Sequence, residues 1–138
     1  MSKTTAREIM STHLINATSD TTIEEALRVL INNRITGLPV VDKKGKMIGV
    51  VSEYDILQQV AKNKNNPNVY QEKIQFSKKV DALKEDTPLK SILEEFINTK
   101  FRRFPVIDKK GNLIGMITRR DLMRVFYYRA KLSSSVDE

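Results

Sequence analysis

The sequence predicts an α/β protein that uses one strand–helix–strand unit twice. Residues 20–56 align with residues 86–122 at a constant offset of 66 and without a gap. Within each copy, an apolar pattern of helical period is followed by short apolar segments that suit buried strands. Because the register holds over the whole unit, we infer one structural module that occurs twice. Of the 37 aligned pairs, 14 are identical, and their first members are positions 20, 21, 27, 31, 32, 39, 40, 42, 43, 44, 45, 48, 49 and 55.

The composition is that of an ordinary globular protein. The 138 residues are 40% hydrophobic and 30% charged, which favours one compact domain or two small repeats that share a core. The chain has no cysteine, which excludes a disulfide framework and a thiolate metal site and fits a cytoplasmic protein. No apolar segment reaches the length of a signal peptide or a membrane span, so no membrane association is expected. The net charge of +7 favours anionic partners.

One long helix with an apolar stripe is expected in each copy. Before the first of them, residues 4–10 predict a short helical turn and residues 13–18 a brief strand. The segment 21–24 predicts a capping box, in which Thr21 and Glu24 exchange hydrogen bonds. In the second copy Thr87 is the expected cap and Pro88 the first helical residue. The stripes expected to face the core are Ile23, Ala26, Leu27, Leu30 and Ile31, and then Leu89, Ile92, Leu93, Phe96 and Ile97.

A hairpin and a second helix follow each stripe. The expected strands are 39–41 with 47–51, and 105–107 with 113–117. The Asp-Lys-Lys-Gly segment between them favours a turn in which glycine adopts positive φ. A glycine in each second strand allows another backbone or a ligand to come close. Helices are then expected to begin at Ser52 and Thr118; the second continues to about Ala130 and directs Leu122, Met123, Val125 and Phe126 towards the core.

These elements divide the chain into a first repeat at 6–60, a connection at 61–79, a second repeat at 80–130 and a flexible tail at 131–138. The connection is rich in asparagine and lysine, so we expect it at the surface. A helix at residues 70–76 is a hypothesis for part of it.

Each repeat has a hydroxyl residue followed three positions later by an aspartate, Ser52 with Asp55 and Thr118 with Asp121. The structural interpretation is a helix cap with an acid in the first turn. The functional interpretation is a ligand site, because a carboxylate accepts from vicinal hydroxyls and a helix start favours anions. The two roles can coexist. Because the motif is repeated at equivalent positions, we favour the ligand role.

The order and repetition of these motifs resemble the cystathionine-β-synthase (CBS) domain, and the tandem pair resembles a Bateman module. The resemblance rests on Pro-Val-Val-Asp, the glycine turn, Gly-Val-Val and Ser-x-x-Asp, and it covers about Ala6 to Tyr127. It implies two β-α-β-β-α repeats that pack sheet to sheet with pseudo-twofold symmetry. It also implies a regulatory module whose two clefts bind adenosine-containing ligands such as AMP, ADP, ATP or S-adenosylmethionine.

By similarity, the two aspartates would hold ribose hydroxyls and the two hydroxyl residues would face phosphate. Segments 15–17, 37–38, 82–83 and 103–104 would flank the base. No metal ligand or obligatory cofactor is implied, and magnesium would accompany only ATP. The residues expected to bind nucleotide are Ile15, Ala17, Gly37, Leu38, Pro39, Ser52, Asp55, Arg103, Phe104, Pro105, Thr118, Arg119, Arg120 and Asp121.

The charges around the two motifs differ. The second repeat has Arg102, Arg103, Arg119 and Arg120 where the first has Thr36, Gly37, Glu53 and Tyr54. A solvated basic surface is the plainer interpretation. Four arginines around a helix start would also suit a phosphate, because guanidinium groups bind phosphate bidentately. We therefore expect the second site to prefer phosphorylated ligands and the first to be weaker, vacant or selective for a neutral nucleoside.

The resemblance further implies a homodimer through the helices after Ser52 and Thr118, with a regulated protein as a further partner. An enzyme is not expected, because the sequence lacks a nucleophile–base arrangement, a metal-ligand cluster and a phosphate-binding glycine loop. The alternative is a module that binds nucleic acid or protein through its basic surface without sensing nucleotide. Nucleic acid is less favoured, since no basic strand is interleaved with aromatic residues.

Overall fold

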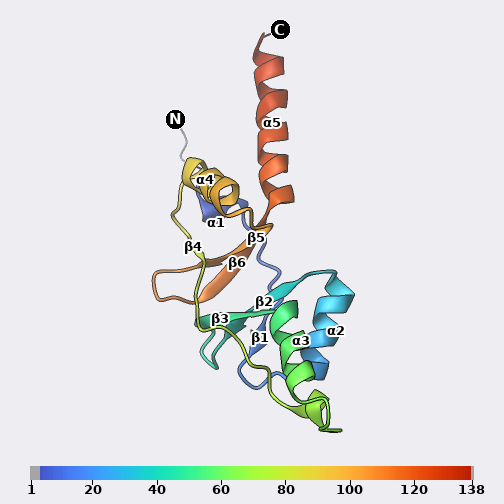
Figure 1. The fold of residues 1–138 in the computed structure, drawn as a ribbon. Helices are drawn as coiled ribbons and strands as arrows, with labels where there is room; N and C mark the ends of the chain where they lie inside the picture. The colour runs from blue at the N-terminus through green and yellow to red at the C-terminus, as the bar shows by residue number, and fades with distance from the viewer. Residues whose placement is uncertain (1–3, 138) are drawn as a thin grey trace. The chain divides into compact units, whose positions relative to one another are not determined.

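The computed structural model describes residues 4–137 and confirms an α/β protein with two three-stranded sheets. The chain forms two compact units. We call residues 15–81 with 111–113 the first unit, and residues 4–14, 82–110 and 114–137 the second unit (Figure 1). Within residues 4–137, no helix has both the length and the apolar character needed to cross a membrane.

In the first unit, the sheet has the strand order β1-β2-β3. Strand β1 runs parallel to β2, with Ala17 opposite Val40, and β2 is antiparallel to β3. The elements are β1 (Ala17–Thr18), α2 (Ile23–Asn33), β2 (Gly37–Val41), β3 (Met47–Ser52), α3 (Glu53–Lys62) and the 3-10 turn η1 (Val69–Gln71). The strand expected at 13–18 is therefore reduced to two residues.

The second unit repeats this order in the sheet β4-β5-β6. Its elements are α1 (Ala6–Ile9), β4 (Leu83–Lys84), α4 (Leu89–Thr99), β5 (Arg103–Ile107), β6 (Leu113–Thr118) and α5 (Arg119–Asp137). The sequence places α1 with the first repeat, yet its contacts are in the second unit. Ala6 is fully buried, its amide donates to Thr87 O at 2.9 Å, and Arg7 pairs with Glu85 at 2.8 Å.

Both long helices begin one residue later than predicted. The capping box of α2 is formed by Thr22 and Glu25, because the Thr21 hydroxyl already accepts from the Thr18 amide at 2.9 Å. The hydrogen bonds from Thr22 lower the pKa of Glu25. In α4, Pro88 is the cap rather than the first helical residue, and no side chain caps that helix.

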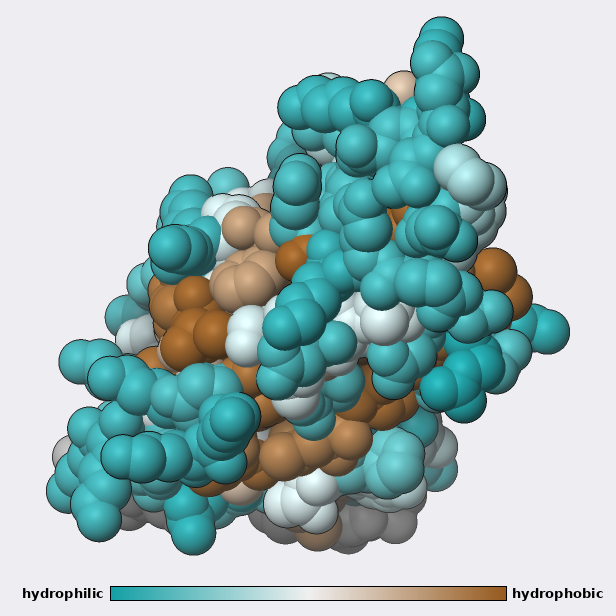
Figure 2. Space-filling view, turned by 90° about the horizontal axis from the view of Figure 1, so that it is seen from below, coloured by the Kyte–Doolittle hydropathy of each residue, from teal (hydrophilic) through white to brown (hydrophobic). Residues whose placement is uncertain are grey.

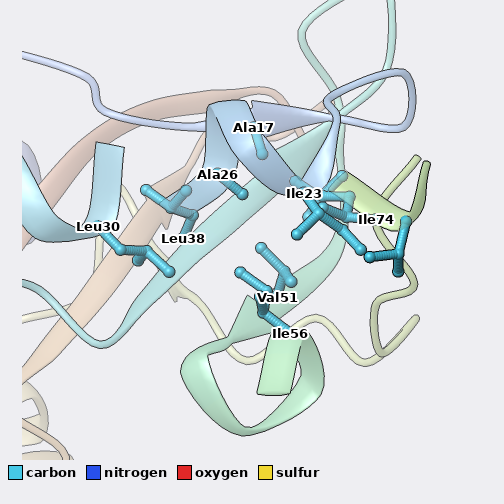
Figure 3. Packing of buried hydrophobic residues seen from close by; sticks show 10 residues of the cluster. Ala17, Ile23, Ala26, Leu30, Leu38, Val51, Ile56 and Ile74 are labelled. Carbon is cyan, nitrogen blue, oxygen red and sulfur yellow. The ribbon is translucent and has the colours of Figure 1, made fainter. Parts of the chain in front are cut away.

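The core of the first unit is built from α2, α3 and one face of the sheet, and its side chains point towards one another in Figure 3. The connection after α3 also contributes to it: Val69 and Ile74 are buried. The buried Gln59 amide fixes this segment by donating to Lys73 O and accepting from the Gln75 amide, both at 2.8 Å. The connection is therefore partly core, and the helix suggested at 70–76 is wrong beyond Gln71.

The predicted stripes are wider than the buried faces. Ile31 and Ile97 are 69% and 64% exposed, although both continue the helical period of the core residues. Among residues 119–133 of α5, Leu122 is buried and Val125 is half-buried, whereas Met123 and Phe126 are exposed. Helix α5 also continues through the expected tail to Asp137 and extends past the other elements of its unit (Figure 1).

The hairpin turns confirm the turn chemistry. Gly45 and Gly111 have φ values of 89° and 87°, a region that glycine adopts without steric cost. The first residue of each turn also acts through its side chain. Asp42 Oδ1 accepts from the amides of Lys44 and Lys46 at 2.9 Å, and Asp108 Oδ1 accepts from the Lys110 amide at the same distance. These hydrogen bonds hold the turn of each hairpin in one conformation.

The glycines in β3 and β6 allow close approach, as expected, and in both cases the neighbour belongs to the chain. A Cβ atom at Gly49 would collide with the backbone oxygen of Ser77, and one at Gly115 would collide with the side chain of Met10. Ser77 is fixed by two hydrogen bonds with the Val50 backbone, at 2.9 and 3.0 Å.

We predict that Gly49→Ala lowers the free energy of unfolding by about 1–3 kcal/mol, because a backbone held by two hydrogen bonds cannot move away from the new methyl group. Gly115→Ala is the matched control and should cost less, because the flexible Met10 side chain can adjust. Chemical denaturation of both variants measures the difference. Equal losses would contradict this explanation.

Candidate functional site

The junction between β3 and α3 is organised by reciprocal hydrogen bonds between Ser52 and Asp55. Asp55 Oδ2 accepts from the Ser52 amide at 2.8 Å and from the Ser52 hydroxyl at 2.9 Å. The Ser52 hydroxyl oxygen in turn accepts from the Asp55 amide at 3.1 Å. This is a capping box that fixes the carboxylate at the first turn of the helix.

The junction between β6 and α5 has the same geometry. Asp121 Oδ2 accepts from the Thr118 amide at 2.8 Å and from its hydroxyl at 3.0 Å, while the Asp121 amide donates to the hydroxyl oxygen at 3.2 Å. The capping interpretation of both motifs is therefore confirmed. Because each box uses one carboxylate oxygen, it leaves the other, Oδ1, outside the cap.

These hydrogen bonds restrict what the hydroxyl groups can do. A hydroxyl has one hydrogen, and in both junctions that hydrogen is donated to the aspartate. The first amide of each helix is also used, since Glu53 donates to Thr36 O at 2.8 Å and Arg119 to Arg102 O at 3.0 Å. Ser52 and Thr118 are thus poor phosphate donors while the boxes are intact. With the boxes intact, Ser52 and Thr118 hold the two carboxylates in a fixed orientation.

The two carboxylates differ at Oδ1. Arg124 donates to Asp121 Oδ1 at 3.2 Å, and the pair has side-chain exposures of 61% and 16%. The equivalent of Arg124 in the first unit is Gln58, which instead donates to the Tyr54 hydroxyl at 3.0 Å. Among residues 4–133, no side chain donates to Asp55 Oδ1. Sequence analysis missed Arg124, although an arginine three residues after an acid in a helix is a recognisable signal.

The arginines of the second unit divide into two groups. Arg119 donates to Lys100 O at 2.7 Å and to Phe101 O at 3.1 Å, so its guanidinium closes the carboxyl end of α4. Arg102, Arg103 and Arg120 form no ion pair with any residue that the structure describes. The four arginines therefore do not act as one cluster, and none of them has an anionic partner in that part of the chain, since Arg119 bonds to neutral carbonyl groups.

Arg103 is the most constrained of the three. It begins β5 and is half-buried. Burial lowers the pKa of its guanidinium, and the neighbouring charge of Arg102 lowers that pKa further. An anion beside Arg103 would offset both effects, because an opposite charge favours the ionised form.

The residues expected beside the base have different exposures. Ala17, Leu38 and Phe104 are buried in the cores of their own units, so their side chains cannot face a ligand. The Phe104 ring packs edge-on against Phe96, with centroids 4.9 Å apart. Ile15, Gly37, Arg103 and Pro105 are half-buried, and Pro39 is buried.

In each unit, backbone pairing places the start of one strand beside the start of a helix. Gly37 is paired with Ser52 and Leu38 with Val51, which places the start of β2 beside the start of α3. In the second unit, the Arg102–Arg119 backbone hydrogen bond does the same for β5 and α5.

Among the described residues, no group of three or more histidine, aspartate or glutamate side chains could hold a metal ion.

A comparison with protein families matches the CBS domain model twice, over residues 6–62 and 73–128. The chain belongs to the CBS domain family. It is a CBS domain pair, as the repetition of its motifs indicates.

The chain is 35% identical over 140 residues to the chloroplastic CBS domain-containing protein CBSX1 of Arabidopsis thaliana, a match that covers 81% of this chain and 58% of that protein. It therefore spans little more than half the length of that relative. Its structure is similar to CBSX2 in complex with AMP, with a TM-score of 0.75, 30% identity and coverage of 91% and 98%. It is also similar to the CBS domain pair of protein MJ0100 in complex with 5′-methylthioadenosine and S-adenosyl-L-methionine, with a TM-score of 0.71, 28% identity and coverage of 93% and 99%.

We predict that Ser52→Ala lowers the free energy of unfolding by about 1 kcal/mol, because the first turn of α3 loses its cap. Ser91→Ala is the control: Ser91 lies inside α4, and its side chain forms no hydrogen bond with any residue in 4–133, so its replacement should be neutral or slightly stabilising. Thermal or urea denaturation measures both. An unchanged midpoint for Ser52→Ala would show that the box does not stabilise the junction.

Proposed function

We propose that this CBS pair is a regulatory module that reversibly binds an adenosine-containing ligand, with AMP, ADP or ATP preferred. The observation that carries the proposal is the geometry of Asp55 and Asp121. Each carboxylate is fixed by a cap through Oδ2, and Oδ1 lies outside the cap; at Asp121 a ligand would replace Arg124 as the donor to Oδ1. A preorganised acceptor binds with less loss of conformational freedom than a flexible one.

Ribose is the part of the ligand that suits this acceptor. Its vicinal hydroxyls can both donate to one carboxylate, and hydrogen bonds to a charged acceptor contribute about 1.5–3 kcal/mol each. The ligands named for the similar solved structures, AMP, S-adenosyl-L-methionine and 5′-methylthioadenosine, all contain adenosine. This shared group supports ribose recognition as the common element.

The two units should contribute differently to ligand choice. In the second unit, Arg103 and Arg120 supply positive charge near the aspartate, whereas the first unit has Glu53 and Tyr54 at the start of α3. Phosphate is therefore favoured in the second unit and disfavoured by Glu53 in the first. The ion pair with Arg124 competes for Asp121, but exposed pairs contribute only about 0–1 kcal/mol, so ribose can displace it.

In the first unit the base would lie against the half-buried residues Ile15 and Gly37, and in the second unit against the half-buried Pro105. Leu38, Pro39, Ala17 and Phe104 would contribute through their backbone, because these residues are buried. Binding would act by linkage: a ligand that prefers one arrangement of the protein increases the population of that arrangement, which a regulated partner protein can detect. Magnesium would be needed only with ATP.

We predict that Asp121→Asn and Asp55→Asn each weaken ligand binding at their own site by about tenfold or more, because a neutral amide is a weaker acceptor for ribose. Calorimetric titration of AMP, ADP, ATP with magnesium and S-adenosylmethionine measures the effect. Asp81→Asn, at an exposed position in the connection, is the charge-matched control. If the wild type binds none of these ligands, the proposal fails, and salt-dependent binding of RNA or DNA becomes the next test of the basic surface.

A second prediction concerns phosphate. Arg103→Gln should reduce the affinity for AMP by about tenfold while leaving adenosine nearly unchanged, since only AMP loses a charged hydrogen bond. Lys109→Gln removes the same charge from the exposed hairpin turn and is the control. An equal loss for AMP and adenosine would mean that Arg103 supports the site rather than the phosphate.

A further inference from the structure

The last helix of the chain exposes aromatic and basic side chains together. In α5, Tyr127 and Tyr128 are 56% and 62% exposed, and Arg124 and Lys131 are exposed as well. Exposed hydrophobic side chains alone would not single out this helix, since they also reach the surface between hydrophilic ones on the face drawn in Figure 2. The feature that distinguishes α5 is the combination of exposed rings with positive charges.

Helical spacing places these four residues on one side of α5. An α-helix turns by about 100° per residue, so residues three, four and seven positions apart lie on the same side. Tyr127, Tyr128 and Lys131 follow Arg124 by three, four and seven positions. We call Arg124, Tyr127, Tyr128 and Lys131 the outer face of α5.

A different row of side chains holds α5 on the second unit. Leu122 is buried and Val125 is half-buried. One turn further along, Arg129 donates to the Thr4 hydroxyl at 3.1 Å, just before α1. Tyr127 and Lys131 are each two positions from Arg129, and residues two positions apart point to nearly opposite sides of a helix. The outer face is therefore turned away from the core of its unit.

On the outer face, the rings and the charges are direct neighbours. The Tyr127 and Tyr128 rings have centroids 5.4 Å apart and are inclined by 67°, so they are not stacked face to face. Lys131 Nζ lies 5.7 Å from the centroid of the Tyr127 ring, in a cation–π arrangement. The pair between Arg124 and Asp121 leaves the Arg124 side chain 61% exposed. The face thus offers aromatic rings and cations side by side.

The charge of this helix favours a polyanion. Between Asp121 and Asp137 the sequence has three basic residues, Arg124, Arg129 and Lys131, and no acidic residue. The tyrosines narrow the class of polyanion, because nucleic-acid bases stack on exposed rings while phosphates contact neighbouring cations. A single strand suits this combination better than a duplex, in which the bases are stacked on one another. A lipid surface suits it less, since none of the four outer-face residues is aliphatic.

We propose that the outer face of α5 binds a single-stranded segment of RNA or DNA, with bases stacked on Tyr127 and Tyr128 and phosphates beside Arg124 and Lys131. The seven positions between these two cations span about 10 Å along the helix, so the contact covers only a few nucleotides. The expected hallmark of such a site was a basic strand with interleaved aromatic residues, and here a helix provides the same combination. The proposal does not depend on nucleotide binding at the junctions, because both tyrosines and Lys131 lie outside the residues proposed for it.

Fluorescence anisotropy of short labelled oligouridylate and oligothymidylate tests the proposal on the whole chain. Tyr127→Leu should weaken binding by about fivefold or more, because a stacking ring is lost, whereas Tyr127→Phe should keep the wild-type affinity. Tyr70→Leu is the matched control, since Tyr70 is an exposed tyrosine outside α5. Saturable binding with this pattern supports the proposal, and the tighter of the two oligonucleotides identifies RNA or DNA as the ligand. Failure of both to bind at low salt, or equal binding by Tyr127→Leu and the wild type, would overturn it.

The salt dependence of binding separates the outer face from the general positive charge of the chain. Lys131→Gln should reduce the slope of log affinity against log salt by about 0.7, the value for one phosphate contact on a single strand. Lys109→Gln removes the same charge from the exposed hairpin turn and should leave the slope unchanged. Equal effects of both variants would mean diffuse attraction and would overturn the proposed site. Binding of phosphatidylserine vesicles in place of the oligonucleotides would assign the face to a membrane and would also overturn it.

Discussion

Both candidate sites depend on one small arrangement, the reciprocal hydrogen bonds between a hydroxyl residue and an aspartate where a strand leads into a helix. Ser52 with Asp55 and Thr118 with Asp121 form it with distances between 2.8 and 3.2 Å. The arrangement ends the strand, starts the helix and holds a carboxylate in one orientation. Structural and functional interpretations of the motif are therefore compatible, because the cap and the ligand would use different oxygens of the same carboxylate.

Because the module is duplicated, the chain has two strand-to-helix junctions of the same geometry, and the differences between them bear on function. The junctions differ in charge, with arginines at 119 and 120 where the first repeat has Glu53 and Tyr54. This difference bears on which ligand each junction prefers.

Sequence alone predicted the parts of the fold that follow local rules. The hairpin turns were predictable because aspartate at the first position and glycine at the fourth favour one turn geometry, and Gly45 and Gly111 adopt it. The junctions were predictable because the spacing of hydroxyl and acid is that of a capping box. The CBS family was predictable from the repetition of both.

The predictions failed where a distant contact decides the outcome. The first capping box moved to Thr22 because Thr21 is used by the preceding turn. Helical periodicity could not separate Leu30, which is buried, from Ile31, which is exposed, since both lie on one broad apolar face. Nor could composition show that the asparagine-rich connection supplies Val69 and Ile74 to the core, or that Arg124 pairs with Asp121.

The most direct measurement of the central claim is a crystal structure of the protein with AMP. We predict ribose hydroxyls within about 2.6–3.0 Å of Oδ1 of Asp55 or Asp121, with the capping hydrogen bonds to Oδ2 still in place. A nucleotide bound away from both junctions, or one that binds only after the capping box opens, would contradict it.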